Sequence, residues 1–241
     1  MNVAHVHTDE GICAERWLGA LVHAGVAPKV LEGPIERAGI PAELVLDESR
    51  IREVTACWVR FETGPRVPRV EGIGELHATI ERAGLPPRAT ERAHEVAAVL
   101  GRAEAAVHDM PVDQVRLHEL GRPIVAARIV AGAAALEELD VDRVTVGPVA
   151  VGQGTIRIAH GRFPVPAPAV QELLRGFVIE GGVEGGDEPS ELTTPSGAAV
   201  LAALAEPVTT TPRMRLASFG RGATRRGGHE RMLTVLVGSL R

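Results

Sequence analysis

The sequence predicts an α/β protein in which helices flank a mixed sheet, arranged as one unit or as two α/β halves. Short Val-rich segments with the period of strands alternate along the chain with longer Ala-rich segments that have the period of helices. Such alternation is typical of α/β architecture. The chain has 241 residues, of which 45% are hydrophobic, so it can bury a sizeable core.

The first half, residues 1–111, opens with a strand, a loop and a helix. Residues 2–7 (NVAHVH) have the pattern of a strand, and residues 12–25 carry apolar side chains at helical spacing up to Gly25. A weaker helix, two strands of a hairpin or meander, and two amphipathic helices are predicted next, over residues 30–40, 43–64, 75–84 and 87–110 in that order.

The second half, residues 112–241, continues the alternation. Its predicted strands are residues 115–120, 143–152, 176–181 and 229–240, and its predicted helices are residues 125–140, 168–175 and 196–207. The segment between the last helix and the last strand contains RGATRRGGHER, which we interpret as a flexible basic loop. The best boundary between the two halves is near residue 112, although both halves can supply strands to one sheet.

Three alternating prolines distinguish the stretch HGRFPVPAPA, residues 160–169. Proline fixes its own φ and favours an extended residue before it, so Pro164 to Pro168 is predicted to be a stiff extended arm that ends where Pro168 opens a helix. His160 and Arg162 precede this arm, where an anion or a carbonyl could meet their donors. The alternative is that the arm only turns a corner and both side chains are solvated.

Composition excludes several classes of function. Aromatic content of 2%, a net charge of -5 and a pI near 6 argue against nucleic-acid binding. Two cysteines are too few for a disulfide framework, and neither a signal sequence nor an apolar run of about 18 residues is present, so we expect a cytoplasmic protein with no membrane span. No nucleophile elbow, P-loop or paired CxxC motif supports a serine hydrolase, an NTPase or a zinc ribbon.

Histidines near the N-terminus are candidate metal ligands. His5 and His7 alternate by two, so both point to one face of the predicted strand, and Glu10 with Cys13 can approach them from the next loop. Imidazole and thiolate are ligands that transition metals accept. His118 is a further candidate, although on a strand it points away from the adjacent Glu119. The alternative is that these histidines are solvated or hydrogen-bonded.

An ordered set of motifs in the second half resembles the LarC family of nickel insertion proteins. The set is VRLHELG, RVTVGPVAVGQG, IAHGRFPVPAPAVQELL, ELTTPSGAAVLAAL and FGRGA, and the opening LGALVHAGV extends the likeness to most of the chain. By this resemblance HGRFPVPAPA is a site loop, and TTPSG forms a hydroxyl-rich helix entry suited to a phosphate. The substrate-binding residues that follow are His160, Arg162, Thr193, Thr194, Ser196 and Gly197.

The resemblance implies a role in making the nickel-pincer nucleotide cofactor. Members of the family insert nickel into a pyridinium dithiocarboxylate mononucleotide while CTP is hydrolysed to CMP, so an active chain would be a nickel insertase of the lyase type. The family's separate C-terminal region, associated with CTP, has no counterpart in these motifs. We therefore expect CTP, with Mg or Mn, to be used by a C-terminal-type partner protein and not by this chain alone. The sequence leaves open whether the chain forms a homo-oligomer.

The chain departs from the family pattern where carboxylates are usual. An Asp and then a Ser-Gly-Ile-Ser-Gly-Asp run are replaced by His7 and then by residues 10–15, EGICAE. Ile124 and Arg128 stand where two aspartates are usual, and Arg116 stands where a histidine is usual. An isoleucine and an arginine cannot ligate a divalent cation. The alternative function is therefore a non-catalytic interaction subunit that kept the fold and lost the metal site.

Overall fold

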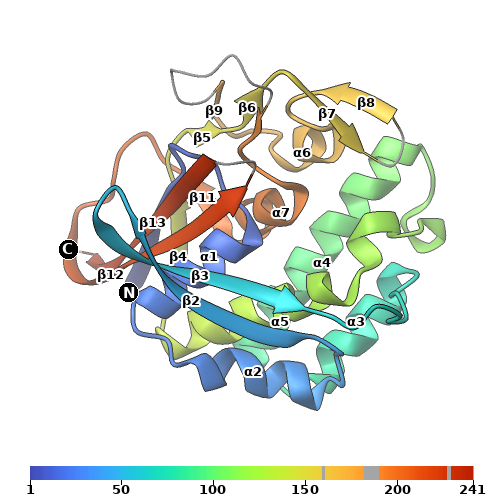
Figure 1. The fold of residues 1–241 in the computed structure, drawn as a ribbon, viewed down its shortest axis with the longest axis horizontal. Coiled ribbons are helices and arrows are strands. Elements are labelled where there is room, and N and C mark those ends of the chain that lie inside the picture. The colour runs from blue at the N-terminus through green and yellow to red at the C-terminus, as the bar shows by residue number, and fades with distance from the viewer. Residues whose placement is uncertain (159–160, 182–189, 227–228, 241) are drawn as a thin grey trace.

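The central element of the structure, a computed structural model, is a seven-stranded mixed sheet (Figure 1). The structure describes residues 1–158, 161–181, 190–226 and 229–240. The strand order across the sheet is β11-β4-β1-β13-β12-β3-β2. These strands are β1 (Asn2–His7), β2 (Glu43–Ile51), β3 (Val54–Glu62), β4 (Arg143–Val146), β11 (Ala205–Pro207), β12 (Met214–Arg226) and β13 (His229–Leu240). The predicted α/β fold with a mixed sheet is confirmed.

Strand β1 is an inner strand of the sheet and has one parallel and one antiparallel neighbour. It pairs in parallel with β4 and antiparallel with β13, and β11 pairs in parallel with β4. The carboxyl ends of β11, β4 and β1 therefore meet at one end of the sheet. In open α/β sheets, ligands bind in the crevice beyond the carboxyl ends of parallel strands.

Helices pack beside the sheet in layers. They are α1 (Ala14–His23), α2 (Pro28–Arg37), α3 (Ile73–Arg82), α4 (Pro87–His108), α5 (Pro123–Glu138), α6 (Pro168–Leu173) and α7 (Pro195–Leu204). Helix α1 packs directly on β3 and β12, α5 packs on α1 and α2, and α4 packs on α5, α6 and α7 (Figure 1). Most of the buried side chains form one cluster that runs through these layers, with Trp17 and Leu18 of α1 fully buried in it, and a second, small cluster contains Ile51, Ala56 and Ala223.

Three short strand pairs extend the structure beyond the main sheet. They are β5 (Val149–Ala150) with β9 (Ile179–Glu180), β6 (Gly152–Gln153) with β10 (Ser190–Glu191), and β7 (Thr155–Ile158) with β8 (Gly161–Pro164). The β5–β9 and β6–β10 pairs join the segment after β4 to the segment between α6 and α7, which brings two parts of the chain that are far apart in sequence to the carboxyl ends of β1 and β4. Strands β7 and β8 pair only with each other.

Glycines let α1 approach the sheet closely. A Cβ on Gly222 of β12 would lie 1.7 Å from the Arg16 carbonyl oxygen, and one on Gly220 would lie 1.7 Å from the Ala20 carbonyl oxygen. On the helix side, a Cβ on Gly19 would lie 2.2 Å from the Cys57 carbonyl oxygen. The FGRGA motif therefore forms the surface on which the backbone of α1 rests.

Two predicted elements are wrong. Residues 115–120 do not form a sheet strand, because Leu117 and Gly121 hydrogen-bond to residues 70 and 71 and the chain then turns in a 3-10 helix, η2 (His118–Gly121). The segment RGATRRGGHER is not a loop throughout, because its first six residues end β12 and its last three begin β13. Residues 227–228 lie outside the described part.

The proline arm is predicted correctly only at its ends. Strand β8 ends at Pro164, the chain bends at residues 165–166, and α6 begins at Pro168 as predicted. A straight extended arm from Pro164 to Pro168 is therefore wrong.

The boundary near residue 112 stays a prediction. It falls at the start of a short 3-10 helix, η1 (Val112–Gln114), which follows α4. Strands from both sides of this point contribute to the same sheet. No helix in the described residues is long and apolar enough to cross a membrane.

Candidate functional site

Three loops meet at the carboxyl ends of β1 and β4, and hydrogen bonds fasten them together. The Thr8 hydroxyl donates to the Pro148 carbonyl at 2.9 Å, and the Ala150 N–H donates to the Thr8 carbonyl at 3.2 Å. The Thr194 N–H donates to the Ile12 carbonyl at 3.0 Å. The loop that enters α1 thus lies against both the segment after β4 and the entry to α7.

Thr193 links two of these loops through hydrogen bonds of its side chain. Its side chain is fully buried, its hydroxyl donates to the Ala150 carbonyl at 2.7 Å, and it accepts from the Ile12 N–H at 3.2 Å. Gly197 lies so close to the loop before α1 that a Cβ there would be 2.3 Å from the Ile12 carbonyl oxygen, so this position has no room for a side chain. These contacts give both predicted site residues a structural role in aligning the entry to α7.

Thr194 and Ser196 are the accessible hydroxyls of the same entry. Thr194 is the N-cap of α7, where its Oγ1 accepts from the Gly197 N–H at 3.4 Å and lies 3.3 Å from Ser196 Oγ. Both side chains are partly exposed. A helix N-terminus carries partial positive charge and unpaired N–H groups, so these hydroxyls sit where an anion is stabilised.

A buried arginine joins the loop before α1 to the segment before α7. Arg16 of α1 is only 2% exposed, and its guanidinium donates to the Glu10 carbonyl at 2.5 Å, to the Leu192 carbonyl at 2.6 Å and to Cys13 Sγ at 3.4 Å. Burial lowers the pKa of the nearby Arg231, and the charge of Arg16 lowers it further, against an opposing effect of Glu10. Arg16 thus places a buried positive charge at this junction, which favours an anion in the same region.

The Glu10 carboxylate is fully engaged within the protein. One oxygen accepts from Arg52 Nη2 at 2.5 Å, and the other accepts from the Met232 N–H at 2.7 Å. Glu10 therefore ties the loop before α1 to β13.

The predicted metal ligands are only partly brought together. His5 and His7 do share a face of β1, with ring centroids 4.8 Å apart. His5 is buried, and its Nδ1 lies 3.0 Å from Thr145 Oγ1 and its Nε2 3.3 Å from Thr211 Oγ1. Burial, reinforced by His7, lowers the pKa of His5 to about 4, against a smaller opposing effect of Asp9. His5 is therefore a neutral, hydrogen-bonded ring, whereas His7 is partly exposed.

Of the other two predicted ligands, the structure describes the side chain of Cys13 but not that of His118. Cys13 is the buried N-cap residue of α1, and burial raises the pKa of its thiol despite the nearby Arg16. Within the described part, no group of three or more His, Cys, Asp and Glu side chains has a geometry that could hold a metal ion.

The loop before the proline segment is described in part. His160 lies outside the described residues. Arg162 is exposed on β8, and its Nη2 donates to Thr155 Oγ1 at 3.1 Å on the neighbouring strand β7. The guanidinium is thus anchored on the β7–β8 hairpin and keeps donors available to solvent.

An ion pair occupies the position where the carboxylates usual in the resembled family are replaced. Glu15, in the first turn of α1, accepts from Arg128 of α5, and both side chains are largely buried. Ion pairs between distant helices cannot be deduced from periodicity, so the sequence interpretation missed this one. The pair joins the first turn of α1, which follows Cys13, to α5.

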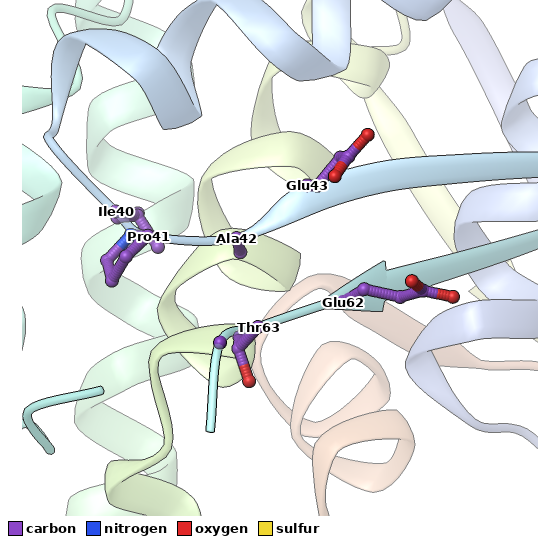
Figure 2. A pocket seen from close by; sticks show the side chains of 7 residues that line it. Ile40, Pro41, Ala42, Glu43, Glu62 and Thr63 are labelled. Atoms are coloured by element: carbon purple, nitrogen blue, oxygen red, sulfur yellow. The ribbon is translucent and has the colours of Figure 1, made fainter. Parts of the chain in front are cut away.

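A separate hollow of about 530 Å³ lies at the ends of β2 and β3 (Figure 2). Its walls combine Ile40 and Pro41 with Glu43 and Glu62, which are cross-strand neighbours. Two carboxylates repel an anionic ligand. This hollow therefore fits a phosphate worse than the entry to α7 does.

These features define an α/β protein with a candidate anion-binding site at the carboxyl ends of its central parallel strands. The chain belongs to the nickel insertion protein family, whose model matches residues 4–239. No solved structure gives a significant match.

Curated relatives agree with this assignment. A protein of Desulfitobacterium hafniense (strain DSM 10664 / DCB-2) named "Pyridinium-3,5-bisthiocarboxylic acid mononucleotide nickel insertion protein" is 35% identical over 230 residues, which cover 92% of this chain and 54% of that protein. A Geobacter metallireducens protein named as a nickel insertion protein is 34% identical over 226 residues, covering 92% of this chain and 57% of the relative. The chain thus spans about half the length of these relatives.

Proposed function

We propose that the chain acts in the biosynthesis of the nickel-pincer nucleotide, where it binds the pyridinium dithiocarboxylate mononucleotide and the nickel to be inserted. The observation that carries this proposal is membership of the nickel insertion protein family over nearly the whole chain. The name of the Desulfitobacterium relative supplies the substrate.

The entry to α7 is the proposed phosphate subsite. Thr194 and Ser196 offer hydroxyls at a helix N-terminus, and the buried Arg16 adds positive charge near it. Thr193 and Gly197 hold this entry against the loop before α1. Arg162 and His160 remain proposed contacts from the neighbouring loop, since a phosphate is well met by a guanidinium fork together with helix-entry donors.

Nickel is the substrate metal in this proposal, and His7 with Cys13 and His118 are its proposed ligands. His7 is partly exposed at the end of β1, and the loop that follows it hydrogen-bonds to the entry to α7, which supports this role. The bound dithiocarboxylate can itself supply sulfur ligands, so the protein need contribute fewer. His5, whose ring nitrogens both face threonine hydroxyls, is proposed to orient His7.

The experiment that tests this role is metal analysis of the untagged chain after equilibration with nickel and the mononucleotide. We expect one nickel ion at this site per chain when the mononucleotide is present. Replacing His7 and Cys13 together with alanine should remove that nickel, with thermal stability measured in parallel. Unchanged nickel content in the folded double variant would show that other groups hold the metal.

A second candidate function is supported by the Glu15–Arg128 ion pair. Arg128 replaces an aspartate that is usual in the family, and its guanidinium pairs with Glu15. The protein itself thus supplies the positive charge that a bound divalent cation would supply to two carboxylates. The chain would then be a non-catalytic interaction subunit. Metal analysis separates the two functions, because this subunit would retain no nickel that depends on the mononucleotide.

Use of CTP is proposed to belong to a partner protein with the remaining region of the longer relatives. The matched residues cover little more than half of those relatives. We expect the pure chain to form no CMP from CTP in the presence of Mg²⁺ or Mn²⁺, as followed by ion-exchange chromatography. Stoichiometric or catalytic CMP formation by this chain alone would contradict that assignment.

A further inference from the structure

Two histidines on neighbouring helices face each other away from the candidate site. His77 lies on α3 and His94 on α4, with their Nδ1 atoms 2.6 Å apart and their ring centroids 4.8 Å apart. Helices α3 and α4 pack side by side (Figure 1). Both side chains are half-buried, so water and dissolved ions can reach them.

A carboxylate defines which nitrogen of His94 carries a hydrogen. His94 Nε2 lies 2.7 Å from Glu81 Oε1, and an ionised carboxylate only accepts hydrogen bonds. Nε2 therefore carries the hydrogen, and the neutral ring turns the lone pair of Nδ1 toward His77. A ligating histidine typically donates its other ring N–H to a carboxylate in this way.

We propose that His77 and His94 form a binding site for a divalent transition metal ion, with their two Nδ1 atoms as ligands and water completing the coordination. Bonds from metal to nitrogen of about 2.0–2.1 Å place adjacent ligands roughly 3 Å apart. The two Nδ1 atoms must therefore move apart by a few tenths of an ångström, and the rings must turn so that both lone pairs point at the metal. On binding, the hydrogen on His77 Nδ1 moves through water to Nε2, which leaves both rings neutral. Glu81 is a positioning residue that holds the His94 tautomer.

Imidazole donors determine which ions fit this pair. They suit nickel, copper and zinc, whereas magnesium and calcium prefer oxygen ligands. The site needs neither the mononucleotide nor His7, so it does not depend on the proposed function. Loss of nickel from one of the two places would leave the other intact.

The test uses ¹⁵N-histidine-labelled chain carrying His7→Ala, titrated with NiCl₂ and followed by NMR of the imidazole signals. Paramagnetic Ni²⁺ should broaden the signals of His77 and His94 at lower concentration than those of the other histidines. Adding His77→Ala or His94→Ala should weaken the Ni²⁺ affinity at least about tenfold, and Glu81→Ala should weaken it while Glu81→Gln restores part of the loss. MgCl₂ should leave all these signals unchanged.

His108→Ala is the matched control, because His108 is also on α4, with Nε2 3.6 Å from Glu104. We expect this variant to bind Ni²⁺ as the His7→Ala parent does, with circular dichroism showing that each variant is folded. The proposal is overturned if Ni²⁺ leaves the signals of His77 and His94 sharp, or if the folded His94→Ala variant keeps the parental affinity. In either case the contact is a hydrogen bond only.

Discussion

Replacing Gly222 with alanine is expected to lower the free energy of unfolding by about 3 kcal/mol or more, at the upper end of the range for overpacked sites. The new Cβ would lie 1.7 Å from the Arg16 carbonyl oxygen and 2.6 Å from the Ala20 nitrogen, both in the backbone of α1. Backbone atoms cannot rotate away, so α1 must move off β12. This movement would also pull Arg16 from the carbonyls that it joins.

Urea denaturation followed by tryptophan fluorescence measures this loss, since Trp17 lies on α1. Gly74→Ala is the control, because Gly74 lies in α3 and a Cβ there meets nothing within 4 Å. Alanine is the better helix former, so this variant should be as stable as the native chain or more stable by up to about 1 kcal/mol. Equal stability of Gly222→Ala and the native chain would refute the close contact of α1 with β12.

Replacing Ser196 with alanine is expected to weaken binding of the pyridinium mononucleotide roughly ten- to hundredfold, the equivalent of about 1.5–3 kcal/mol for a hydrogen bond to a charged group. The reason is that Ser196 offers an accessible hydroxyl at the entry to α7, where the proposed phosphate is held. Stability should change little, because the side chain is partly exposed. Equilibrium dialysis of the mononucleotide gives the affinity.

Ser218→Ala makes the same chemical change on β12 and serves as the control. Ser218 lies next to the irregularity in β12 between Leu216 and Ser218, in a different part of the sheet. Its affinity for the mononucleotide should equal that of the native chain. Equal affinities of Ser196→Ala and the native chain would remove Ser196 from the proposed subsite.

Most helices and the hydrophobic strands could be predicted because their periodicity reflects one buried face. Strand β12 could not, because Gly220 and Gly222 leave room for the backbone of α1, and glycine has a low strand propensity. Residues 115–120 alternate like a strand, yet the pairing partner of this segment is the connection near residue 70. Strand propensity reflects how well a side chain packs against the adjacent strands, and local sequence does not show which strands those are.

The candidate site was predictable only where a local motif marks it. The entry to α7 was predicted through the resemblance of TTPSG to the family motif, and the shared face of His5 and His7 follows from alternation along β1. Arg16 was missed because its partner Leu192 lies 176 positions away, and nothing local distinguishes it from a solvated arginine. The engagement of His5 by threonines from β4 and from the segment before β12 was hidden for the same reason.

Calorimetric titration of the untagged chain with pyridinium-3,5-bisthiocarboxylic acid mononucleotide tests the central claim most directly. The proposed function predicts saturable binding of one mononucleotide per chain, and it predicts that Thr194→Val combined with Ser196→Ala abolishes this binding while the protein stays folded. A folded native chain that releases no binding heat, and retains no mononucleotide in parallel dialysis, would contradict the claim that this chain takes part in nickel insertion as the substrate-binding component.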